Sequence, residues 1–119
     1  MATLANGIIV LVALLHGYFL VLEMFLWDKP AGLRAFGQTR EQALQTKVLA
    51  ANQGLYNGFL AAGLLWGVAQ GPDGFEFKVF FLLCVVLAGL YGGFTASRKI
   101  LLVQALPGLI GLALTLAAR

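Results

Sequence analysis

Charged residues are scarce in this sequence, and their scarcity excludes an ordinary water-soluble domain. Of the 119 residues, only 11% are charged and 61% are hydrophobic. A soluble domain usually carries about a quarter charged residues, because its surface must be hydrated. A chain of this length cannot bury so much apolar surface in a core of its own. The composition therefore predicts one domain, residues 1–119, embedded in a lipid bilayer.

Residues with reactive or metal-binding side chains are also few. The single cysteine, Cys84, cannot form an internal disulfide, and the one histidine is too little for a metal site. There is no G-x-S-x-G motif, phosphate-binding glycine loop or Cys-x-x-Cys pair. We therefore expect no metal and no cofactor. Because the basic residues lie between apolar stretches and form no stripe, we expect no nucleic-acid partner either.

Four apolar stretches are long enough to cross a bilayer core about 30 Å thick, which takes about 20 helical residues. They cover approximately residues 4–27, 48–69, 77–96 and 100–118. The first has no basic n-region and no small-residue cleavage site, so we expect a retained span and not a signal peptide. The predicted fold class is an all-α integral membrane protein, an antiparallel bundle of four transmembrane helices.

The connections contain recognisable helix boundaries. Pro30 and Gly32 predict a turn after the first helix. Thr39-Arg40-Glu41-Gln42 fits a capping box, so the second helix is expected to begin near Arg40. Pro107 lies inside the fourth helix and is expected to kink it or loosen its backbone hydrogen bonding.

The distribution of lysine and arginine predicts how the bundle is oriented. The first and third connections carry six basic residues, namely Lys29, Arg34, Arg40, Lys47, Arg98 and Lys99. The opposite side carries only Lys78 and Arg119. Because basic residues are retained in the cytoplasm, we expect both termini on the outer side and the long first loop on the cytoplasmic side.

Polar side chains of all four predicted helices gather in the cytoplasmic half of the membrane. At a rise of about 1.5 Å per residue, Glu23 lies about 6 Å inside Trp27 and Asn52 about 8 Å inside Lys47. A charged carboxylate in lipid costs at least about 2.5 kcal/mol, so these groups are expected to face inward. The candidate ligand-binding residues are Glu23, His16, Asn52, Gln53, Tyr56, Asn57, Tyr91 and Gln104.

Two interpretations of Glu23 stay open. In one, its carboxylate holds the first helix against the second through Asn52, Gln53 and Tyr56. In the other, it handles a proton or a cation. His16 precedes Glu23 by seven residues and so shares its helix face, where we expect it to serve packing.

Glycines recur at a spacing that favours close helix contact. Three pairs follow the small-x-x-x-small pattern, namely Gly54 with Gly58, Gly63 with Gly67, and Gly89 with Gly93. Such pairs pack helices within one bundle, or join copies in a homo-oligomer, and the sequence leaves both open.

The chain resembles a family of small bacterial inner-membrane proteins, of about 120 residues and four spans, that is catalogued as a domain of unknown function. The resemblance is carried by His16, Glu23, Trp27 with Pro30, and the run Asn52-Gln53-Gly54-Leu55-Tyr56-Asn57-Gly58. It covers essentially the whole chain and implies a multi-pass protein of the bacterial cytoplasmic (inner) membrane. It implies no activity.

A weaker resemblance is to small multidrug-resistance exporters, four-helix chains with a functional glutamate in their first helix. Glu23 would take that part, with Tyr56 or Tyr91 stacking on a cationic substrate. The long basic first loop and the off-centre position of Glu23 depart from the exporter pattern.

Three functions fit these observations. The leading hypothesis is a membrane-embedded binding protein or small transporter, whose polar cavity holds a small or amphipathic ligand. The alternative is a non-catalytic accessory subunit of a larger membrane complex, in which the polar residues only join the helices. The third is a membrane enzyme acting on a lipid or isoprenoid, with Glu23 or His16 as general acid or base.

Overall fold

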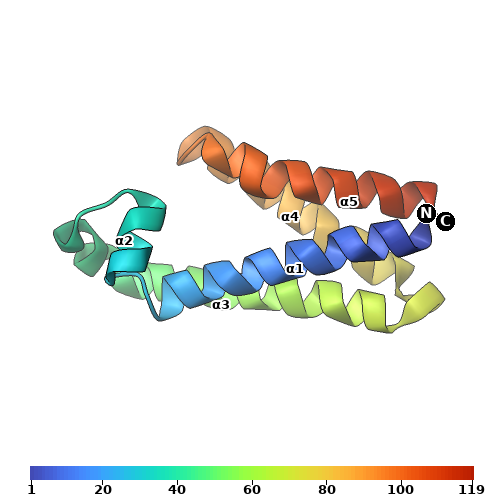
Figure 1. Cartoon of the computed structure of the whole chain (residues 1–119), viewed down its shortest axis with the longest axis horizontal. Coiled ribbons are helices and arrows are strands. Elements are labelled where there is room, and N and C mark those ends of the chain that lie inside the picture. The colour runs from blue at the N-terminus through green and yellow to red at the C-terminus, as the bar shows by residue number, and fades with distance from the viewer. The chain divides into compact units, whose positions relative to one another are not determined.

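The computed structural model describes residues 1–119 and contains helices and turns without a strand (Figure 1), which confirms the predicted all-α class. Its helices are α1 (Ala2–Met24), α2 (Pro30–Phe36), α3 (Arg40–Ala69), α4 (Phe75–Thr95) and α5 (Leu106–Ala117). A 3-10 helix, Gly71–Gly74, leads into α4, and a π-helical segment, Leu101–Ala105, leads into α5.

Two of the helices are long and apolar enough to cross a membrane. They are Ala2–Met24 and the continuous stretch Gly71–Thr95. The apolar stretch Leu101–Ala117 is shorter, and α3 is made more polar by Asn52, Gln53 and Asn57. The four-span bundle and its orientation therefore stay predictions.

The chain forms two compact units, which are described one at a time. The larger unit comprises Met1–Leu14 and Leu60–Arg119, and the smaller unit comprises Leu15–Phe59. Helices α1 and α3 each contribute one part to either unit.

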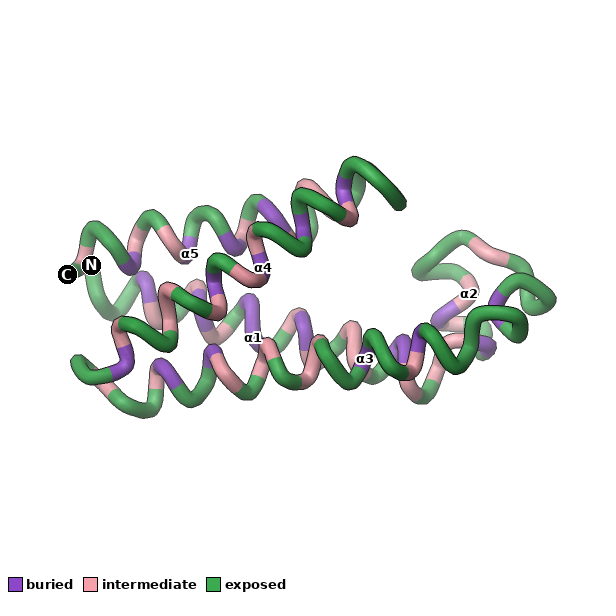
Figure 2. The backbone as a smooth tube through the Cα atoms, turned by 180° about the vertical axis from the view of Figure 1, so that it is seen from behind, coloured by how far each residue is buried: buried purple, intermediate pink, exposed green.

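The larger unit packs four helical segments around one apolar core. Ile9, Val12 and Ala13 come from α1, Leu64 comes from α3, and Leu82 and Val85 come from α4. Leu112 of α5 packs against this cluster. The sides of α4 and α5 away from the core keep large apolar side chains exposed, for example Leu87 of α4 at 65% and Leu109 of α5 at 52%. Figure 2 shows exposed stretches along both helices. In water such a surface would be unfavourable, because burying apolar surface is what drives folding.

Glycine brings the helices of the larger unit into close contact. A Cβ atom built on Gly89 would lie 2.7 Å from the backbone nitrogen of Ala105. Gly93 faces Leu101, Gly63 faces the ring of Phe81, and Gly67 faces Lys78. Both glycine pairs of this unit therefore serve packing within the chain, between α4 and the segment before α5 and between α3 and α4.

The start of α3 confirms the predicted capping box. The Thr39 backbone N–H donates to Gln42 Oε1 at 3.0 Å, and the Gln42 backbone N–H donates to Thr39 Oγ1 at 3.2 Å. The two residues thus satisfy each other's free groups, and α3 begins at Arg40 as expected.

Helix α2 was not predicted, because Pro30 and Gly32 indicated only a turn. Pro30 instead occupies the first helical turn, where its fixed φ suits a helix and its missing N–H costs nothing. The helix ends at Gly37, whose φ of 60° is left-handed and whose N–H donates to the Leu33 carbonyl. The available signal was Pro30 at the first of the seven helical residues and Gly37 directly after the last.

The backbone ahead of Pro107 is loosened, as expected. The Leu106 N–H donates to the Leu101 carbonyl, five residues earlier, and the π-helical segment results. In a regular α-helix the ring of Pro107 would clash with the Val103 carbonyl, and the wider turn relieves that clash.

Replacing Gly89 with alanine tests the close contact between α4 and the segment before α5. We expect Gly89→Ala to lower the free energy of unfolding by about 1 to 3 kcal/mol, because its Cβ meets backbone atoms that cannot move aside. Gly7→Ala is the matched control, since no atom lies within 4 Å of its added Cβ. Denaturation in detergent, followed by circular dichroism, measures both variants. Equal stability of the two would contradict the packing described for Gly89.

Candidate functional site

The smaller unit places one face of α3 against the end of α1. The buried residues of this face are small, namely Ala43, Ala50 and Gly54. A Cβ atom on Gly54 would lie 2.7 Å from Met24 Cγ and 3.0 Å from Glu23 Cβ. One turn further along, Gly58 faces Leu20. The pair Gly54 and Gly58 therefore lets α3 pack directly on the part of α1 that carries Glu23.

Glu23 is buried at this contact and is hydrogen-bonded across it. The Asn57 Nδ2 amide donates to Glu23 Oε1 at 2.5 Å, and the Glu23 residue is only 5% exposed. The second carboxylate oxygen, Oε2, takes no hydrogen bond from the chain. One side of the carboxyl group is thus fixed, and the other is left for a proton or a ligand.

No lysine or arginine of the chain forms an ion pair with Glu23. The ion pair that the structure contains joins Asp28 to Lys47 instead. A buried carboxylate without a counter-charge is strongly unfavourable. Glu23 must therefore be protonated, or it must be neutralised by a cation from outside the chain.

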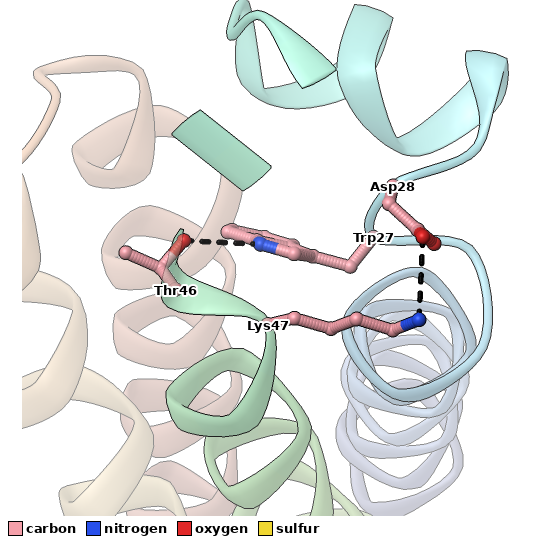
Figure 3. A network of polar contacts seen from close by, with 4 residues as sticks. All are labelled: Trp27, Asp28, Thr46 and Lys47. Carbon is pink, nitrogen blue, oxygen red and sulfur yellow. Dashed lines mark hydrogen bonds and ion pairs between the residues drawn. The ribbon is translucent and has the colours of Figure 1, made fainter. Parts of the chain in front are cut away.

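A polar clamp closes the loop that follows α1 (Figure 3). Lys47 Nζ donates to Asp28 Oδ2 at 3.2 Å, and Trp27 Nε1 donates to Thr46 Oγ1, also at 3.2 Å. Two adjacent residues after α1 are thereby joined to two adjacent residues of α3. The clamp thereby ties the loop after α1 to α3, about 15 Å along α3 from Asn57.

The lysine changes the acidity of Asp28. The hydrogen bond from Lys47 lowers the pKa of Asp28 from its ordinary value, and the nearby positive charges of Lys47 and Lys29 lower it further. Asp28 therefore stays ionised at neutral pH, and its negative charge holds Lys47 in the clamp.

Helix α2 packs on the same loop. The ring of Phe36 lies 4.8 Å from that of Trp27, measured between centroids. Gly32 is pressed against the Leu26 carbonyl, where no side chain would fit. The indole of Trp27 thus contacts both α2 and α3, which orders the whole loop.

His16 does not join the Glu23 contact. It is completely buried, and its ring meets that of Phe19 edge to face at 5.4 Å. Seven residues separate it from Glu23, which is about 10 Å along a helix. His16 and Glu23 share the buried side of α1 as expected, but the distance separates them chemically.

Three other candidates lie elsewhere on α3. Asn52, Gln53 and Tyr56 are exposed, so they do not surround the carboxyl group of Glu23. Asn57 reaches it because it follows Ala50 and Gly54 at helical spacing and shares their face. Asn52 and Tyr56 are turned by 100° or more from Asn57, at about 100° per residue. The residues expected to hold Glu23 were Asn52, Gln53 and Tyr56, but the hydrogen bond comes from Asn57, another candidate of the same helix.

The last two candidates belong to the larger unit. Gln104 Nε2 donates to the Val85 carbonyl at 3.1 Å, which ties the π-helical segment to α4. Tyr91 is 75% exposed and faces away from the core of this unit. Nowhere in the chain do three His, Cys, Asp or Glu side chains come together as a set of metal ligands.

Comparison with known proteins shows similarity to proteins without an assigned role. The model of a family described as "Protein of unknown function (DUF1304)" matches residues 10–116. A protein of Lactococcus lactis subsp. lactis (strain IL1403), described as "Uncharacterized protein YpaA", is 34% identical over 96 residues. That match covers 79% of this chain and 81% of the relative. No solved structure is significantly similar to the chain. The resemblance to a family of unknown function is confirmed, whereas the resemblance to exporters stays a prediction.

The clamp between Asp28 and Lys47 makes stability depend on pH. Because the pKa of folded Asp28 is lowered, its contribution is complete above the unfolded carboxyl pKa of about 3.9 and is lost as pH falls through the folded pKa. We therefore expect Asp28→Asn to be less stable than the wild type at pH 7, with the difference shrinking toward pH 3. Thermal unfolding in detergent across this range measures it. Glu41→Gln, at an exposed carboxylate of α3, is the control, and a constant difference for Asp28→Asn would contradict the assignment.

Proposed function

The chain belongs to the family described as "Protein of unknown function (DUF1304)", and we propose that it is a membrane-embedded binding protein or small transporter for a small cationic or amphipathic ligand. The proposed location is the cytoplasmic membrane of a bacterium, in keeping with the bacterial relative. Glu23 is the proposed ligand-binding group, with Asn57 holding it in place.

The proposed membrane topology has four spans, namely α1, the part of α3 from about residue 48, α4 and α5 with the segment before it. Two of these helices have the length and apolar character of spans. The exposed apolar side chains of α4 and α5 support lipid contact for those helices as well. The basic residues of the first and third connections favour the cytoplasmic side for those loops.

The observation that carries the ligand proposal is the unbalanced carboxyl group of Glu23. No hydrogen bond of the chain reaches its Oε2 atom, and no lysine or arginine forms an ion pair with it. A substituted ammonium group would supply both the missing donor and the missing charge. A proton would also neutralise it, so exchange of a proton for a cationic ligand at Glu23 gives a mechanism for transport.

The accessory-subunit alternative gives the hydrogen bond between Asn57 and Glu23 a purely structural role. In it, the bond from Asn57 only joins α3 to α1, and Glu23 stays protonated throughout. The enzyme hypothesis comes third, because His16 is too far along α1 to work with Glu23 as an acid–base pair.

Substituting Glu23 with glutamine separates binding from packing. Glutamine keeps the carbonyl oxygen that accepts from Asn57, so the fold is expected to survive, but it cannot carry the charge. We expect ligand affinity to fall about 10- to 100-fold, the loss of one charge-assisted hydrogen bond. Native mass spectrometry of protein extracted gently from membranes measures the bound mass directly.

Glu41→Gln is the matched control, because it makes the same chemical change at an exposed site of the smaller unit. A bound mass that persists in Glu23→Gln would contradict the proposed role of Glu23 in ligand binding. A wild-type chain without any bound mass would favour the accessory-subunit alternative.

Labelling of single cysteines tests the orientation. In a Cys84→Ala background, we expect Asp73→Cys to react with a membrane-impermeant maleimide in intact cells, because the 3-10 helix before α4 lies outside. Ala35→Cys and Ser97→Cys should react only after permeabilisation, since both connections are cytoplasmic. All three positions are exposed in the structure. The reverse labelling pattern would contradict the orientation, and equal labelling would contradict membrane insertion.

A further inference from the structure

The side of α3 opposite Gly54 and Asn57 is a second contact surface. It consists of Val48, Asn52, Leu55 and Phe59, which we call the outer α3 face. All four residues are exposed, and Val48, at 83%, is the most exposed large apolar residue of the chain. Their spacing of four, three and four residues is the heptad spacing that keeps one seam facing a neighbouring helix.

Asn52 is the exposed polar residue at the centre of this face, and no group of the chain forms a hydrogen bond with its side chain. The positions one turn away on either side are the apolar residues Val48 and Leu55. If α3 is inserted as proposed, this amide faces lipid, where an unpaired polar group is costly. It therefore needs a partner that both donates and accepts hydrogen bonds.

A second Asn52 is such a partner. A side-chain amide has two N–H donors and an acceptor oxygen, so two asparagines pair with each other. Copies of one membrane protein share their orientation, which makes their α3 helices parallel and brings equal residues together about a two-fold axis. A single asparagine in an apolar heptad seam is a known means of setting register in parallel helix pairs.

We propose that the outer α3 face joins two copies of this chain in a parallel homodimer centred on Asn52. The outer α3 face is not one of the glycine pairs that the sequence suggested for a homo-oligomer. Gly54 and Gly58 already pack against α1 of the same chain. The proposal rests on the membrane insertion described above, but it does not depend on Glu23 binding a ligand.

Disulfide scanning in membrane vesicles tests the interface. In a Cys84→Ala background, Val48→Cys, Asn52→Cys, Leu55→Cys and Phe59→Cys are oxidised separately and the dimers are resolved on a gel. We expect all four to cross-link, and Leu55→Cys, which keeps Asn52 and lies one turn from it, most completely. Leu87→Cys, at an exposed apolar position on α4, is the matched control and should stay monomeric. Failure of the α3 cysteines to cross-link, or equal cross-linking of Leu87→Cys, would overturn the proposal.

The contribution of the amide is measured with Asn52→Ala. An interhelical hydrogen bond in a membrane accounts for about a threefold to twentyfold change in dimer affinity, so dissociation should increase by that factor. Single-molecule photobleaching in lipid vesicles at varied protein density gives the dimer fraction, with Leu87→Ala as control. Circular dichroism verifies that the variants remain helical. An unchanged dimer fraction in Asn52→Ala, or a wild-type chain that is monomeric at all densities, would overturn the proposal.

Discussion

Close approach of helices at glycine is the constraint on which the other contacts depend. In the smaller unit, Gly54 lets α3 lie directly on Met24 and Glu23, and only this closeness brings the short amide of Asn57 to the carboxylate. In the larger unit, Gly89 meets the backbone of Ala105, and Gln104 reaches the Val85 carbonyl from the same place. Larger residues at these positions would separate the helices and break both polar contacts. Where helices lack a strong apolar drive to associate, small residues and a few hydrogen bonds do this work.

The two buried acidic residues of the smaller unit differ in the groups that bind them. Asp28 has its counter-charge in Lys47 and stabilises a loop. Glu23 has a neutral partner in Asn57 and keeps an unbalanced carboxyl group. The charge of Asp28 is neutralised by a lysine of the chain. The charge of Glu23, five positions earlier, can be neutralised only by a proton or by a bound cation. This difference is the physical basis for proposing that Glu23 binds a ligand.

Local features of the fold followed from the sequence, whereas the facing of individual side chains did not. The capping box at Thr39 and the loosened backbone before Pro107 each depend on residues close together in the chain, and both are confirmed. Helix α2 was missed because a proline and a glycine indicate a turn as readily as a short helix. The choice of Asn57 over Asn52 depends on which face of α3 packs on α1. Ala50 and Gly54 decide that face, because small residues permit close contact with α1. The polar pattern does not reveal it, because the run Asn52-Gln53-Gly54-Leu55-Tyr56-Asn57-Gly58 has polar residues on more than one side of the helix.

The π-helical segment of residues 101–105 has a consequence for how relatives of this chain align. A π-helical turn holds one residue more than an α-helical turn, so it amounts to a one-residue insertion that the helix absorbs without breaking. Removing one residue there would return the turn to α-helical geometry and bring the ring of Pro107 back against the preceding carbonyl, while the helix on either side keeps its faces. A single-residue gap at this point in an alignment therefore marks the loss of the wide turn that accommodates Pro107, although the helix on either side keeps its length and character.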